Sequence, residues 1–177
     1  IKSVTINDGG KWSTSVKVTV NFDIEDATFL QINNTETIAK TLVWDPYQPK
    51  RVDWILLAGD GEKVIFTKFK DAAGNETEVQ KNNIILDTQP PTGEVSIDDG
   101  SRFTNKQDKI VHIQIKSADA KGMQVCNTPD FTNIKLEPFS SDIANWALDG
   151  EDAPKTVFVR LKDEAGNLSQ VYTSTII

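Results

Sequence analysis

The chain has very little of the residues that most often carry out chemistry. Its 177 residues include one cysteine and one histidine. The lone Cys126 excludes an intramolecular disulfide, and its place in an alternating pattern predicts a small buried hydrophobe. Strand parity places His112 on the solvent side, away from the nucleophile that a catalytic triad requires, and a zinc site needs more histidine or cysteine. The sequence therefore predicts a protein that is not an enzyme.

Net positive charge and long apolar runs are also missing. The formal net charge is −7, which argues against binding to nucleic acid and to anionic lipid. No apolar run approaches the length of a transmembrane helix, so we expect no membrane insertion. The sequence contains no signal peptide and begins abruptly with Ile1-Lys2-Ser3-Val4, so we expect the chain to be a segment of a longer protein, with any secretion signal outside it.

The strongest positive feature is an internal duplication. Four blocks repeat at an offset that stays between 91 and 93 residues: Val4–Trp12 with Val95–Phe103, Leu30–Thr35 with Met123–Thr128, Trp54 with Trp146, and Lys63–Asn75 with Lys155–Asn167. We therefore predict two modules, residues 1–88 and 89–177. Pro90 and Pro91 lie at the joint near 88–92 and predict a short, semi-rigid spacer.

Each copy alternates apolar and polar residues in the manner of a half-buried strand. In the first copy the apolar positions are Val16, Val18, Val20, Phe22 and Ile24, and in the second they are Val111, Ile113 and Ile115. Further strands are expected at 4–6, 28–32, 63–70, 76–86, 95–97, 122–126, 155–162 and 168–176. No segment shows an apolar stripe at helical spacing, so the predicted class is all-β, with two tandem β-sandwiches.

A shared turn supports this interpretation. Gly74 and Gly166 are expected to adopt positive φ, and Asp71 and Asp163 to accept hydrogen bonds from the turn amides. Trp54 and its counterpart Trp146 fall before the penultimate strand, where a large ring could fill the gap between the sheets.

Taken together, these motifs resemble the immunoglobulin-like repeats of bacterial secreted enzymes, S-layer proteins and surface adhesins. The most specific pieces are Phe158–Ser169 and Asp87–Thr92. The resemblance implies immunoglobulin-like domains that act as spacers or binding accessories, with chemistry housed in other domains.

Two sites are conceivable. Calcium could be held near the joint by Asp87, Glu94, Asp98 and Asp99, although such acids are more often solubilising turn residues. Trp44, Tyr47 and Trp54 could form a platform for sugar rings, although packing is the commoner role of such residues. Carboxylates paired for glycoside hydrolysis are not expected, because the acids cluster in turns.

The leading expectation is a non-catalytic spacer or assembly pair on the bacterial cell surface or outside the cell, without a cofactor. Its partners would be other domains of the same chain, cell-wall polysaccharide or another glycan, or neighbouring surface-layer subunits. One alternative is a carbohydrate- or receptor-binding module of an adhesin or glycanase. Another is a bacteriophage decoration, fibre or tail protein at the virion surface.

Overall fold

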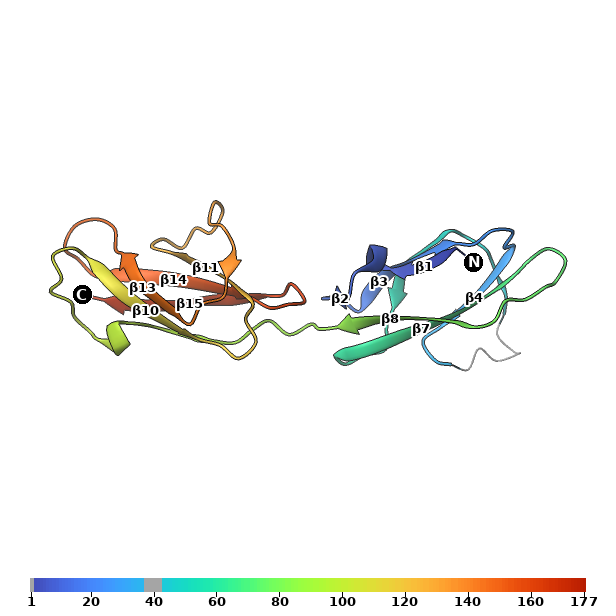
Figure 1. Ribbon diagram of the computed structural model, residues 1–177, viewed down its shortest axis with the longest axis horizontal. Helices are drawn as coiled ribbons and strands as arrows, with labels where there is room; N and C mark the ends of the chain where they lie inside the picture. Colours follow the sequence, from blue (N-terminus) through green and yellow to red (C-terminus); the bar gives the residue numbers. More distant parts are fainter. Residues whose placement is uncertain (1, 37–42) are drawn as a thin grey trace. The chain divides into compact units, whose positions relative to one another are not determined.

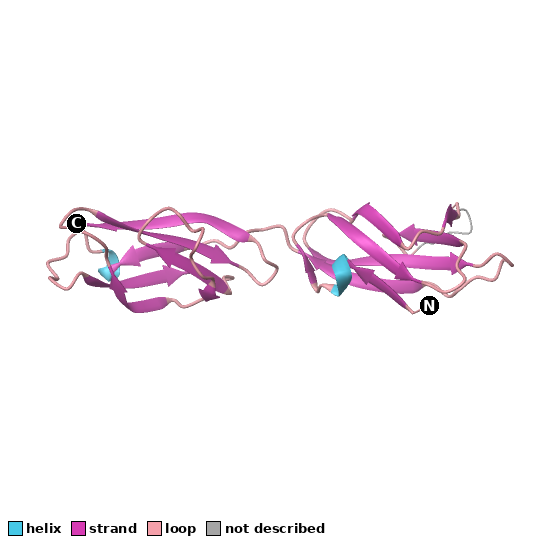
Figure 2. Cartoon of the chain, turned by 90° about the horizontal axis from the view of Figure 1, so that it is seen from above, coloured by secondary structure: helices cyan, strands magenta, loops and turns pink. Residues whose placement is uncertain are grey.

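The computed structural model describes residues 2–36 and 43–177, and it is all-β. The chain divides into two compact units, residues 1–88 and 89–177, each of which has its own sheets and core. The strands are labelled in Figure 1, and Figure 2 shows how little of the chain is helical. The predicted fold class of two β-sandwiches is confirmed.

The first unit packs a three-stranded sheet against a five-stranded one. The small sheet has the order β1-β3-β6, formed by Ser3–Ile6, Lys17–Asp23 and Lys50–Ile55. The larger sheet has the order β2-β8-β7-β4-β5, formed by Trp12–Ser13, Gln80–Leu86, Gly61–Lys70, Phe29–Asn33 and Asp45–Pro46. All of these pairings are antiparallel except that between β2 and β8.

The second unit repeats this plan. Its three-stranded sheet has the order β13-β10-β9, formed by Asp142–Ala147, Ile110–Lys116 and Glu94–Ile97. The four-stranded sheet has the order β12-β11-β14-β15, formed by Glu137–Pro138, Gly122–Cys126, Lys155–Lys162 and Leu168–Ile176. In place of β2, residues 102–104 pair with Ile177, because Ile177 donates to the carbonyl of Arg102 and Thr104 donates to that of Ile177.

The alternating residues build the two cores, as the pattern predicts. Val18, Val20 and Phe22 of β3 point inward, as do Val111, Ile113 and Ile115 of β10. Burial of such side chains contributes about 1.5–3 kcal/mol each. Val16 is an exception to the predicted inward set, because it precedes β3 and is 37% exposed.

Five strands among the described residues were not predicted from the sequence: the two-residue strands β2, β5 and β12, and the longer strands β6 and β13. Trp54 and Trp146 lie within β6 and β13 rather than before the next strand. Both strands are edge strands whose exposure pattern departs from strict alternation, and their pairings contain register shifts. The predicted strand 76–86 begins at Gln80, with only an isolated bridge from Lys70 to Glu76 before it.

The only helical elements in the described residues are short 3₁₀ turns, η1 (Asn7–Gly9) and η2 (Asp98–Gly100). None of the described helices is long and apolar enough to cross a membrane.

In the first unit, the entering and leaving segments of the chain run side by side in the same direction. The side-chain amide of Asn82 in β8 donates to the backbone carbonyl of Val4, and further along both segments Ser13 pairs in parallel with Leu86. The second unit has the same course, since Tyr172 donates to Pro91 and residues 102–104 pair with Ile177. The chain therefore enters each unit at one end and leaves it at the other.

Candidate functional site

The three aromatic residues considered for sugar binding have different environments. Tyr47 packs against the first core, with its ring in edge contact with Phe69 at 6.3 Å. Its hydroxyl donates to the backbone carbonyl of Phe22 at 3.0 Å. Tyr47 therefore both packs and hydrogen-bonds within the unit.

Trp44, unlike Tyr47 and Trp54, is not among the described residues that pack against the first core. Its ring is half-buried, and the ammonium of Lys70 lies 4.3 Å from the ring centroid. The same ammonium lies 5.0 Å from the ring of Phe29, so Lys70 is a cation–π partner of two rings. A sugar stacking on this face of Trp44 would have to displace Lys70.

Trp54 is fixed by a residue that the sequence analysis did not single out. Its indole N–H donates to Oδ1 of Asn34 at 2.8 Å, and Nδ2 of Asn34 donates to the carbonyl of Ile55 at 2.7 Å. Because Asn34 follows β4 and Trp54 lies in β6, this pair joins the two sheets.

The second unit contains the same device. Trp146 donates to Asn127 at 2.7 Å, and Asn127 donates to the carbonyl of Ala147 at 2.9 Å. We call each pair a tryptophan–asparagine clamp. The signal that could have revealed it was the alignment of the block ending in Asn34-Thr35 with the block ending in Asn127-Thr128.

The carboxylates considered for calcium are divided between the two units, with Asp87 in the first and Glu94, Asp98 and Asp99 in the second. Within residues 2–36 and 43–177, no group of three or more histidine, cysteine, aspartate or glutamate residues is arranged to hold a metal ion. Glu94 begins β9 and faces Lys116 at 3.8 Å, whereas Asp98 and Asp99 follow the other end of that strand. Four strand residues span about 13 Å, too far for a shared ion. Asp87 follows β8 in the first unit, where its amide donates to Ser13.

Asp98 has a structural role instead. Its Oδ1 accepts a hydrogen bond from the amide of His112 at 2.8 Å, and its carboxylate pairs with Lys106 at 3.0 Å. Burial alone would raise the pKa of Asp98, but the His112 amide and the Lys106 ammonium outweigh it and lower the pKa below its ordinary value. Asn7 plays the same part in the first unit, where its Oδ1 accepts from the amide of Thr19 at 3.0 Å. The same kind of hydrogen bond from a backbone N–H is therefore accepted by an aspartate in the second unit and by an asparagine in the first.

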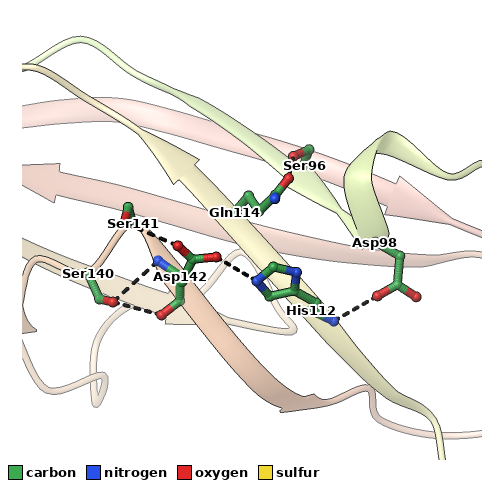
Figure 3. A network of polar contacts seen from close by, with 7 residues as sticks. All are labelled: Ser96, Asp98, His112, Gln114, Ser140, Ser141 and Asp142. Carbon is green, nitrogen blue, oxygen red and sulfur yellow. Dashed lines mark hydrogen bonds and ion pairs between the residues drawn. The ribbon is translucent and has the colours of Figure 1, made fainter.

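The single histidine belongs to a polar network on β10 and β13, drawn in Figure 3. Its Nε2 lies 2.7 Å from Oδ1 of Asp142, and Oγ of Ser141 donates to Oδ2 of the same carboxylate at 3.3 Å. The carboxylate therefore lies between the hydroxyl and the ring. A triad needs the ring between the hydroxyl and the carboxylate, so Ser141 has no base here.

Cys126 is buried, as predicted. Burial raises the pKa of its thiol, against the smaller opposing effect of a hydrogen bond with the backbone of Thr128. Its Sγ lies 2.9 Å from the carbonyl of Thr128. A thiol that is buried and protonated is a poor nucleophile.

The predicted turn carboxylates are confirmed in their role. Asp71 accepts from the amide and the side chain of Asn75, both at 2.8 Å. Asp163 accepts from the amides of Gly166 and Asn167, at 2.7 and 2.8 Å. Gly74 and Gly166 have φ of 93° and 108°. These acids close their own turns.

Comparison with solved structures finds the fibronectin(III)-like modules of CbhA from Clostridium thermocellum. The TM-score is 0.57 and the identity is 10%, over 99% of this chain and 93% of that chain. At this identity the likeness shows the fold alone, a fibronectin(III)-like β-sandwich. No family model matches the chain, and no curated protein matches it.

Proposed function

We propose that the chain is a non-catalytic pair of immunoglobulin-like modules that serves as an in-line spacer within a longer extracellular protein. The observation that carries this proposal is the course of the chain through each unit. The entering segment and the last strand lie side by side and run in the same direction, so each unit receives the chain at one end and passes it on at the other. This suits a connector that holds other domains apart.

The hydrogen bonds at the exit of the first unit suit a connector that carries tension. The amide of Ile85 donates to Lys11, and the amide of Asp87 donates to Ser13 at 2.9 Å. When two parallel neighbouring segments are pulled from opposite ends, their hydrogen bonds are loaded together along the strand direction. Such bonds resist force better than bonds that open one at a time.

The joint is short. Thr88 is tied to the first unit, because its amide and hydroxyl donate to Asp60 at 3.1 and 2.9 Å. The carbonyls of Pro91 and Thr92 accept from Tyr172 and Ser117 of the second unit. Only two residues, Gln89 and Pro90, lie between these anchors, and a proline-containing spacer of this length limits the freedom of the chain.

Force spectroscopy of the full chain tests the proposal. We expect two unfolding events, each releasing roughly 25–30 nm of chain, the length of about ninety extended residues less the folded span. Asp87→Pro removes the amide that donates to Ser13 and should lower the force of one event only, whereas Asp87→Ala keeps that amide and serves as the control. Two events at unchanged force in Asp87→Pro would contradict a tension-bearing role. Turnover in a hydrolase screen would contradict a non-catalytic one.

A further inference from the structure

A hollow lies beside the end of β15 in the second unit. Its apolar lining comes from Leu148, Ile176 and Ile177, and Thr104 and Ala153 form its sides. The ammonium-bearing side chains of Lys106, Lys109 and Lys155 also line it. Glu151 and Asp152 line it as well, so the hollow has an apolar part and charged side chains of both signs.

The first unit shows what occupies this position. There β8 continues to Leu86, which pairs with Gly61 on one side and Ser13 on the other and is only 1% exposed. Lys63 faces Ile84 as Lys155 faces Ile176, so the two ladders are in the same register. In the second unit, a residue at the position equivalent to Leu86 would therefore face Ala153 and Thr104, and both of these residues line the hollow.

The next residues of the first unit complete the comparison. Thr88 binds the carboxylate of Asp60 through its amide and its hydroxyl. By the same register Asp152 corresponds to Asp60. The side chain of Asp152 is 99% exposed, and its Oδ1 lies 3.4 Å from Nζ of Lys109. Asp152 is therefore available to a second donor.

On the basis of the proposed spacer function, we propose that this hollow is the docking site of a linker segment continuing β15 in the manner of Leu86-Asp87-Thr88. An aliphatic side chain fills the hollow, and a serine or threonine two residues later donates to Asp152. The linker is then part of the fold of the module before it.

The test extends the full chain by Leu-Asp-Thr after Ile177 and compares it with an extension by Ser-Asp-Thr. We expect the leucine extension to raise the Tm of the second unit by roughly 5–10 °C relative to the serine extension, because it buries one aliphatic side chain. The indole N–H signals of Trp146 and Trp54 in NMR spectra report the two units separately, so the first unit is an internal control that should not change. Asp152→Asn should reduce the gain from Leu-Asp-Thr and leave that from Leu-Asp-Ala unchanged.

Equal Tm values for the leucine and serine extensions would overturn the proposal. An equal gain from a free Leu-Asp-Thr peptide at micromolar concentration would also overturn it, because the hollow would then belong to a separate partner. The spacer function is tested separately, by force spectroscopy and by the hydrolase screen. It can therefore fail while the leucine extension still raises the Tm of the second unit.

Discussion

The indole N–H of Trp54 donates to the side-chain carbonyl of Asn34, and through this bond an edge strand of one sheet is tied to the other sheet. The same asparagine donates back to the carbonyl next to Trp54, at Ile55. Asn127 and Trp146 repeat both bonds in the second unit. A device that occurs twice at equivalent positions is a property of the module.

Removing an asparagine of the clamp should destabilise only its own unit. Asn34→Ala and Asn127→Ala each leave an indole N–H and a backbone carbonyl without their partner, and we expect a loss of about 1–3 kcal/mol. Urea denaturation followed by the indole signals of Trp54 and Trp146 measures each unit. Asn105→Ala, at an exposed position, is the control. Unchanged stability in both clamp variants would show that the bonds contribute nothing.

Gly93 should not tolerate a side chain. A Cβ there would lie 2.7 Å from Cδ1 of Leu161 and 2.7 Å from the carbonyl oxygen of Lys116. We expect Gly93→Ala to cost about 1–3 kcal/mol in the second unit through overpacking. Gly10→Ala is the matched control, since its nearest contact would be 3.5 Å away. Similar denaturation midpoints for the two variants would contradict the packing argument.

Acid should weaken the turn of the first unit. Hydrogen bonds from the side chain and amide of Asn75 lower the pKa of Asp71 from its ordinary 3.8. A carboxyl whose pKa is lower in the folded state stabilises the fold above pH 3.8 and loses that contribution as pH falls through the folded value. The unfolding free energy of the first unit should therefore fall below pH 4, and less steeply in Asp71→Asn. Asp149→Asn, in an exposed turn, should follow the unaltered chain. Parallel curves for all three would exclude the effect.

Calcium should leave the melting temperatures unchanged. In the second unit Glu94 lies at the opposite end of β9 from Asp98 and Asp99, and Asp98 already binds Lys106 and the amide of His112. A ligand stabilises a fold only if it binds the folded state. Calorimetry with millimolar calcium and with a chelator makes the comparison. A Tm that rises with calcium concentration would require a site that this arrangement does not explain.

Trp44→Ala removes the cation–π contact between Trp44 and Lys70. We expect the unfolding free energy of the first unit to fall by less than about 1 kcal/mol, the value of an exposed cation–π pair. A glycan array with the full chain and this variant tests the carbohydrate alternative. We expect no saturable binding. Binding lost in Trp44→Ala and kept in Lys70→Ala would favour a sugar platform over the spacer.

Several features could be predicted from the sequence because they are local or repeated. The alternation around Val20 and Val111 predicts the inward face, since side chains on a strand alternate between its two faces. Asp71 and Asp163 act within four residues of themselves, so the turn motif predicts their partners. The edge strands β6 and β13 were missed because their register shifts blur the alternation on which prediction depends.

By itself the sequence determined the all-β class and the hydrogen bonds that Asp71 and Asp163 accept within their own turns, because strand periodicity and turn chemistry act over a few residues. Only the tertiary structure decided which polar groups from distant parts of the chain meet. Asn34 lies 20 residues from Trp54, and His112 lies 30 residues from Asp142. The packing of the two sheets brings Asn34 to Trp54, and the pairing of β10 with β13 within one sheet brings His112 to Asp142.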